Sequence, residues 1–202
     1  VAASHVLTGS EIPAEGLADA AAAVLRREGQ SLALYNLGCG PQGYPPLRQF
    51  VADKLRRHRG TTIAAGDVFI TSGSSQGLDL VNRLLVNPGD TVLMEEFSYT
   101  GAIKRALRSG ARVIGAPLDG EGIDVEKLDA ILARLQTEGI TPKYIYTIPT
   151  IQNPTGSIMP LARRQALLDV ARRYGVLVFE DECYADLGFA GDAPASLYSL
   201  AP

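Results

Sequence analysis

Short apolar runs alternate with amphipathic segments along most of this chain, and this alternation restricts the fold more than any other feature. The runs are rich in β-branched residues and show little polar-apolar alternation, which is typical of strands buried on both faces. The segments between them carry apolar residues three or four positions apart, which indicates amphipathic helices. We therefore expect an α/β fold, a three-layer sandwich whose mostly parallel sheet is covered by helices on both faces.

The pattern places the individual elements. Strands are predicted at 68–71, 91–94, 112–115, 143–148 and 176–180. A helix is predicted from Ala14 to Arg27, and Arg163 and Arg164 are expected on the exposed face of the last long helix. The other helices follow from apolar faces formed by Leu47, Phe50, Val51 and Leu55; by Leu78, Val81 and Leu85; by Val125, Leu128, Leu132 and Leu135; and by Leu161, Leu168 and Ala171.

The chain is expected to divide into an N-terminal segment with its helix, 1–42, and part of a larger domain, 43–202. No closing helix or strand is expected over 197–202. A parallel sheet that stopped there would leave an edge strand uncovered, and such an edge promotes aggregation. We therefore expect this sequence to be a portion of a longer protein.

Composition limits the classes of partner. A net charge of -3 argues against nucleic acid or an anionic membrane as the main partner. No run approaches the roughly 20 apolar residues of a membrane span, and no leading segment resembles a secretion signal. Cys39 and Cys183 make neither a disulfide framework nor a zinc-type spacing. We expect a cytoplasmic protein without a metal, acting on small molecules.

Two short polar motifs each follow a predicted strand. Asn153-Pro154-Thr155-Gly156 comes soon after the strand at 143–148, and Asp181-Glu182-Cys183-Tyr184 comes directly after 176–180. In open α/β sheets, ligands bind at the carboxyl ends of the strands. An amide, a carboxylate and a phenol at one sheet edge suit a flat, polar, heteroaromatic ligand.

Each of these side chains has a structural and a functional interpretation. Asp181 either caps a turn or serves as counter-ion to a buried cationic ring nitrogen, whose pKa a fixed negative charge would raise. A protonated pyridine of this kind withdraws electrons, as in pyridoxal phosphate. Asn153 either opens a turn or donates to a ring oxygen. Tyr184 is either an amphipathic residue at the rim of the core or a ligand contact beside Asp181.

The segment Gly73-Ser74-Ser75 lies between a predicted strand and a predicted helix. Small residues at a helix N-terminus suit a phosphate group, although serine is also an ordinary N-cap residue. The pattern matches neither the dinucleotide fingerprint nor a Walker loop, which disfavours those ligands. Tyr99 follows the strand at 91–94 and is either a surface aromatic or a ring that stacks on a planar ligand.

As an ordered set, these motifs resemble the class I/II aminotransferases of fold type I, which depend on pyridoxal 5'-phosphate. The segments 40–48, 87–90 and 119–122 are also similar to that family, and the resemblance runs from about Ile12 to the end of the chain. Within the family, the chain most resembles the branch that acts on 2-aminoadipate and aromatic amino acids.

The resemblance implies a role for each motif. Gly73, Ser74 and Ser75 would hold the cofactor phosphate, and Tyr99 would stack on the pyridine ring. Asn153 and Tyr184 would bond the phenolic oxygen of the ring, and Asp181 would bond its nitrogen. It further implies that 43–202 is an incomplete cofactor-binding large domain, that the substrates are an amino acid and a 2-oxo acid, and that the protein is a homodimer.

The chain also departs from the family. Its lysines, Lys54, Lys104, Lys127 and Lys143, do not match the position of the Schiff-base lysine, so no catalytic residue is assigned and the fragment alone is expected to be inactive. Three other functions stay open. They are a pyridoxal-phosphate-dependent lyase, the effector-sensing domain of an aminotransferase-like transcription regulator, and a non-catalytic module that binds a phosphorylated metabolite. The regulator would need a basic helix-turn-helix module upstream.

Overall fold

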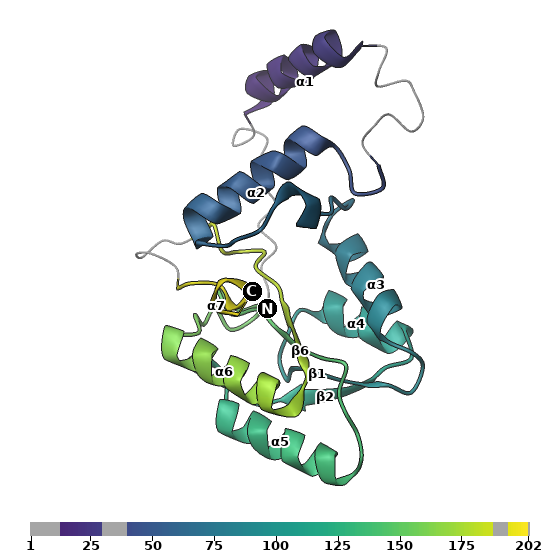
Figure 1. Cartoon of the computed structure of the whole chain (residues 1–202), viewed down its shortest axis with the longest axis vertical. Helices are drawn as coiled ribbons and strands as arrows, with labels where there is room; N and C mark the ends of the chain where they lie inside the picture. Colours follow the sequence, from purple (N-terminus) through teal and green to yellow (C-terminus); the bar gives the residue numbers. More distant parts are fainter. Residues whose placement is uncertain (1–12, 30–39, 188–193, 202) are drawn as a thin grey trace.

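The computed structural model describes residues 13–29, 40–187 and 194–201. Its centre is a four-stranded parallel sheet in the order β2-β1-β5-β6, and Figure 1 labels three of these strands, β1, β2 and β6. The strands are β1 (Thr91–Glu95), β2 (Arg112–Ala116), β5 (Tyr144–Thr147) and β6 (Leu177–Glu180). These strands confirm four of the predicted ones, with ends shifted by at most one residue at either side. Because all four run parallel, their carboxyl ends lie at one edge of the sheet.

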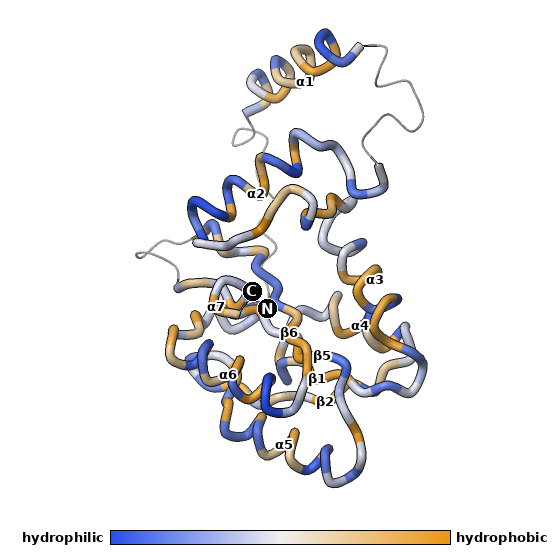
Figure 2. The backbone as a smooth tube through the Cα atoms, viewed as in Figure 1, coloured by the Kyte–Doolittle hydropathy of each residue, from blue (hydrophilic) through white to orange (hydrophobic). Residues whose placement is uncertain are grey.

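Helices cover both faces of this sheet, as expected for a three-layer sandwich. The core of one face includes residues of α3 (Ser74–Leu85) and α4 (Thr100–Arg108), and that of the other includes residues of α5 (Val125–Thr137) and α6 (Leu161–Tyr174). The strands contribute alternately, so that Tyr144 and Tyr146 pack on the α3–α4 face and Ile145 on the other. The helices themselves alternate between polar and apolar residues along their length (Figure 2). The predicted fold class is confirmed.

Two further helices lie toward the N-terminus. α1 (Ala14–Glu28) and α2 (Pro45–Arg59) confirm the predicted helices, and the hydroxyl of Tyr44 donates to Glu28 Oε1 at 2.6 Å between them. The predicted apolar face of α2 is only partly buried, because Leu47 and Phe50 remain 42% and 58% exposed in the described part of the chain. The division at residue 43 stays a prediction.

The strand predicted at 68–71 is wrong. This segment follows a short 3-10 helix, η3 (Ala65–Asp67), and belongs to neither described sheet. The Ile70 N–H donates to the carbonyl of Gln42 at 2.8 Å, which is a single contact with a loop. A β-strand requires a neighbouring strand that exchanges backbone hydrogen bonds with it along its length. Among the described residues, this segment has no such neighbour.

The expectation of no regular structure over 197–202 is also wrong. Residues Leu197–Leu200 form one helical turn, α7, whose first N–H groups are satisfied by side chains. Ser196 accepts from Ser199, while Glu180 at the end of β6 accepts from the N–H groups of Leu197 at 2.7 Å and Tyr198 at 3.0 Å. A small antiparallel hairpin of β3 (Leu118–Asp119) and β4 (Gly122–Ile123) precedes α5 and was not predicted.

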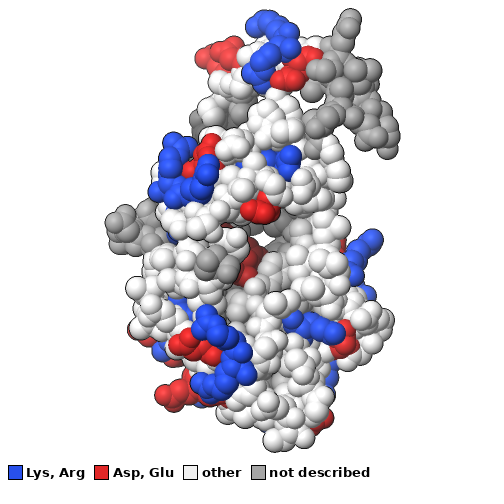
Figure 3. Space-filling view, viewed as in Figure 1, with Lys and Arg blue, Asp and Glu red and all other residues white. Residues whose placement is uncertain are grey.

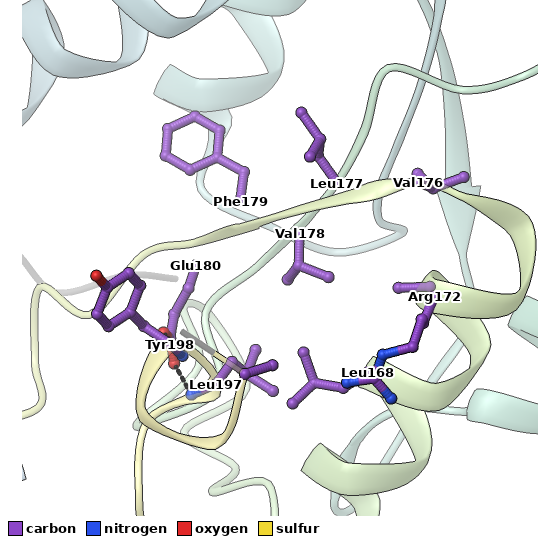
Figure 4. Close-up of a pocket in the computed structure, with 11 residues that line it drawn as sticks. Leu168, Arg172, Val176, Leu177, Val178, Phe179, Glu180, Leu197 and Tyr198 are labelled. Carbon is purple, nitrogen blue, oxygen red and sulfur yellow. Dashed lines mark hydrogen bonds between the residues drawn. The ribbon is translucent and has the colours of Figure 1, made fainter. Parts of the chain in front are cut away.

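A groove of about 520 Å³ runs along β6 between α6 and α7 (Figure 4). Leu168 and Val178 line it, and Leu177 of β6 is 57% exposed.

Among the described helices, none combines the length and the apolar character that a membrane crossing requires. On the face seen in Figure 3, basic and acidic side chains are intermixed rather than separated into large areas of one sign.

Candidate functional site

The two motifs that follow β5 and β6 meet at the carboxyl edge of the sheet. The N–H of Asp181 donates to the carbonyl of Thr147 at 2.9 Å, which extends the pairing of these strands by one residue. Beyond it, Asn153 Nδ2 lies 3.4 Å from the hydroxyl of Tyr184 and donates to it. The structure therefore brings Asp181, Asn153 and Tyr184 together on two adjacent loops.

Asp181 is held by a side chain that the sequence did not indicate. The hydroxyl of Tyr146 in β5 donates to Asp181 Oδ2 at 2.7 Å. Tyr146 is buried, and burial, followed by its hydrogen bond to Asp181 and the charge of that carboxylate, raises the pKa of the Tyr146 hydroxyl far above the ordinary value. The hydroxyl therefore stays protonated and acts as a donor to the carboxylate.

The N-terminus of α3 carries Gly73, Ser74 and Ser75. Gly73 is the N-cap with φ of 80°, in the left-handed region that glycine adopts readily, and no side chain caps the helix. The first N–H groups of a helix have no acceptor inside it and carry a partial positive charge. This helix end is thus suited to an anion such as a phosphate.

Tyr99 is the residue before α4, and its ring folds back over the first turn of that helix. A methyl group added at Gly101 would lie 2.3 Å from the Tyr99 ring, so only glycine leaves room for this arrangement. Arg105 then joins the starts of both helices, since it donates to the carbonyls of Ser75 at 3.2 Å and Gly101 at 2.9 Å. The N-termini of α3 and α4, with Tyr99, therefore lie side by side.

Glu95 at the end of β1 connects the loop of Tyr99 with the loop of Asn153. This buried carboxylate accepts hydrogen bonds from the hydroxyls of Thr147 at 2.6 Å and Ser98 at 3.0 Å, from the N–H of Ile148 at 2.9 Å and from Gln152 Nε2 at 2.8 Å. Burial raises the pKa of Glu95, and these donors oppose the shift. The residue acts as an internal brace for the sheet edge.

Arg164 forms a second brace, and its predicted place on the exposed face of α6 is wrong. Its side chain is 0% exposed, and burial lowers the pKa of its guanidinium while the charge of Glu182 opposes the shift. The guanidinium donates to Glu182 at 3.4 Å, and it also bonds the loop of Asn153 and the start of α7, at Pro149 O, Thr150 Oγ1, Met159 O and Ala195 O. It therefore ties both motif loops to α6. Its neighbour Arg163, predicted on the same face, is partly exposed and pairs with Asp119.

Cys183 lies between Asp181 and Tyr184 in the sequence. The residue as a whole is exposed, but partial burial of its thiol, followed by the charge of Asp181, raises the pKa of the thiol to about 11. At neutral pH, the thiol is therefore protonated and a poor nucleophile.

We expect iodoacetamide to alkylate Cys183 roughly 10- to 100-fold more slowly at pH 8 than it alkylates a free cysteine peptide, because the reactive thiolate is scarce. Mass spectrometry of the peptide that contains Cys183 measures the rate as a function of pH. The rate should still rise above pH 9, and a plateau below that pH would contradict the raised pKa.

The residues described above present several different kinds of polar group, both hydrogen-bond donors and acceptors. The start of α3 offers N–H groups to an anion, Asp181 offers a carboxylate to a cationic nitrogen, and Asn153 and Tyr184 offer polar groups to an oxygen. Tyr99 adds an aromatic face. Within the described ranges, no three His, Cys, Asp or Glu side chains form a group that could hold a metal ion. These are the kinds of group that a planar, phosphorylated heterocycle would require.

Comparison with known proteins points to one family. The sequence pattern of the family described as aminotransferase class I and II matches residues 7–202. The 2-aminoadipate transaminase of Thermus thermophilus is 38% identical over 189 residues, which are 94% of this chain and 44% of that protein. This chain thus spans less than half the length of that relative.

Solved structures agree with this match. An archaeal alanine:glyoxylate aminotransferase superimposes with a TM-score of 0.88 at 34% identity and covers 95% of this chain, which spans 46% of that structure. The α-aminoadipate aminotransferase LysN of Thermus thermophilus, solved in complex with N-(5'-phosphopyridoxyl)-L-leucine, gives a TM-score of 0.85 at 36% identity, with 96% of this chain and 46% of that chain covered.

Proposed function

The chain belongs to the class I and II aminotransferase family, and on this premise we propose that the full-length protein transfers an amino group from an amino acid to a 2-oxo acid with pyridoxal 5'-phosphate as cofactor. The observation that supports this proposal most is the meeting of Asp181, Asn153 and Tyr184 at the same sheet edge. A carboxylate beside two polar groups matches the ring nitrogen and the phenolic oxygen of this cofactor.

We assign the individual roles on chemical grounds. The N–H groups and hydroxyls of Gly73, Ser74 and Ser75 would bind the phosphate, because the uncapped start of α3 favours an anion. Tyr99 would lie against the ring. Asn153 and Tyr184 would bond the phenolic oxygen, and Asp181 would keep the ring nitrogen protonated.

The cofactor, when bound, withdraws electrons from the substrate carbon and so makes removal of a proton easier. The described residues contribute positions and charge to this chemistry. Asp181 holds a proton at the ring nitrogen, and Glu95 and Arg164 keep the loops that carry the contacts in place. We propose that the lysine that binds the cofactor covalently and moves the proton lies outside these 202 residues.

The remaining properties of the full-length protein are proposed from the family. Its substrates would be 2-aminoadipate, aromatic or related amino acids, in line with the names of the matched relatives. We propose a cytoplasmic homodimer that binds neither nucleic acid nor membranes. The mixed charges of the surface in Figure 3 are compatible with this proposal.

The test is a transamination assay on the full-length protein loaded with pyridoxal phosphate. We expect 2-aminoadipate or an aromatic amino acid to change the visible spectrum of the bound cofactor, and a 2-oxo acid to restore it with formation of a new amino acid. Mass spectrometry identifies the products. Release of carbon dioxide or of a β-substituent without amino transfer would instead indicate a lyase. Binding without turnover would favour a sensing or storage role, and no binding at all would reject the cofactor.

A further inference from the structure

Two tyrosines of β5 occupy closely similar environments but bond to different partners. Tyr144 and Tyr146 are each 1% exposed. Both rings pack edge-on against Phe179 of β6, with centroids 5.7 Å and 5.5 Å away. The hydroxyl of Tyr144 donates to Asn82 of α3 at 2.9 Å, whereas that of Tyr146 donates to Asp181 at 2.7 Å. The Tyr144 hydroxyl thus bonds a residue of the core, whereas the Tyr146 hydroxyl bonds a residue of the candidate site.

The hydrogen bond from Tyr146 restrains the Asp181 side chain, which the backbone hydrogen bond of Asp181 does not hold. The N–H of Asp181 is fixed by the carbonyl of Thr147, so the main chain at this position is held. The carboxylate can still rotate about its own torsions. Because Tyr146 is locked between the sheet and α3–α4 by its packing, its hydroxyl fixes one carboxylate oxygen, Oδ2. The Cys183 thiol also bonds the carboxylate, but it belongs to the same loop as Asp181, whereas Tyr146 belongs to the packed sheet.

We propose that Tyr146 is a positioning residue that aims the Asp181 carboxylate at the ring nitrogen of the cofactor and so keeps that nitrogen protonated. This inference rests on the proposed function. Without this bond, the carboxylate would keep only the contact with the Cys183 thiol of its own loop. It would then rotate more freely, and its average attraction for the ring proton would fall. Hydrogen bonds to charged groups are among the stronger ones in proteins, so the effect should be measurable.

The experiment compares Tyr146→Phe with Tyr144→Phe in the full-length holoprotein. Each variant loses one buried hydroxyl of β5 and keeps its ring against Phe179, so the aromatic packing is preserved in both. Tyr146→Phe should lose somewhat more stability, because its hydroxyl bonds a carboxylate rather than the neutral amide of Asn82. The primary measurement is the ¹⁵N chemical shift of pyridoxal phosphate labelled at its ring nitrogen, which separates the protonated from the neutral ring. The secondary measurements are the dissociation constant of the cofactor and the kcat and KM of transamination.

For Tyr146→Phe, we expect the nitrogen signal to move toward that of the neutral ring, kcat to fall about 10-fold with little change in KM, and the cofactor to bind roughly 3- to 10-fold more weakly. Tyr144→Phe should keep the wild-type signal and a kcat within about 2-fold of wild type. A wild-type signal in Tyr146→Phe, or equal shifts in both variants, would overturn the proposal.

Asp181→Asn separates this proposal from the proposed function. If Asp181→Asn shifts the nitrogen signal and Tyr146→Phe does not, Tyr146 has no positioning role although the cofactor assignment holds. If neither variant shifts it, or if the wild-type protein does not retain the cofactor, the cofactor assignment fails and the positioning role fails with it.

Discussion

Replacing Arg164 by methionine is expected to lower the free energy of unfolding by about 3–5 kcal/mol, one of the two largest effects that the structure predicts. The guanidinium is wholly buried and bonds the Pro149–Thr150 loop, Met159 and Glu182. Methionine fills much of the volume but leaves these acceptors, and the charge of Glu182, without their partner. Urea denaturation of the full-length protein, followed by circular dichroism, measures the difference.

Arg163→Met is the matched control. It lies one residue earlier in the same helix, but its ion pairs with Asp119 and Glu121 are partly exposed, and such pairs contribute about 0–1 kcal/mol. Arg164→Lys should fall between the two, because a lysine retains the charge but cannot donate in so many directions. Equal stability of Arg163→Met and Arg164→Met would contradict the role of Arg164 as a brace.

Asp181→Asn is expected to reduce kcat/KM for transamination by roughly 100- to 1000-fold, the range seen when a preorganised electrostatic partner of a reaction is removed. An amide has nearly the shape of the carboxylate and can still accept from Tyr146, so the fold should be preserved. It carries no charge, however, and cannot keep a ring nitrogen protonated. Steady-state kinetics with the amino acid that the wild-type protein prefers provide the measurement.

Asp186→Asn serves as the control for this substitution. Asp186 follows in the same segment and forms an ion pair with Lys54, with its side chain 67% exposed. Its loss should change kcat/KM by less than about 2-fold, because exposed ion pairs contribute little. Near-normal turnover of Asp181→Asn would reject its assigned role, while equal losses in both variants would indicate that the segment as a whole is disturbed.

The sequence was a good guide to elements whose signal is local. The strands near 91–94 and 143–148 were found because their β-branched and aromatic residues favour a buried strand wherever they lie. The segment 68–71 carries a similar signal but has no partner strand in the described part of the chain. Strand pairing is a long-range property, so composition alone could not distinguish these cases.

The site was predicted only in part for a related reason. Motifs at strand ends led to Asp181, Asn153 and Tyr184, which the structure does bring together, although their cofactor contacts stay predictions. Tyr146 was missed because its link to Asp181 joins positions 35 apart in the chain.

Arg164 was missed although a local signal existed. It lies three residues after Leu161 and four before Leu168, on the apolar stripe predicted for this helix, where an ordinary exposed arginine would not be expected. The sequence also indicates the helical turn α7 at Leu197–Leu200, because Ser196, a favourable N-cap residue, directly precedes it. A charged side chain and a position near the end of the sequence each favour exposure or irregular structure, but in these two cases the spacing and the cap residue are the stronger signals.

The most direct test of the central claim is a crystal structure of the protein with pyridoxal phosphate. We expect the ring nitrogen within hydrogen-bonding distance of the Asp181 carboxylate, the phenolic oxygen beside Asn153 and Tyr184, and the phosphate at the start of α3 near Ser74 and Ser75. A cofactor bound elsewhere, or an Asp181 side chain turned away from the ring nitrogen, would contradict the account.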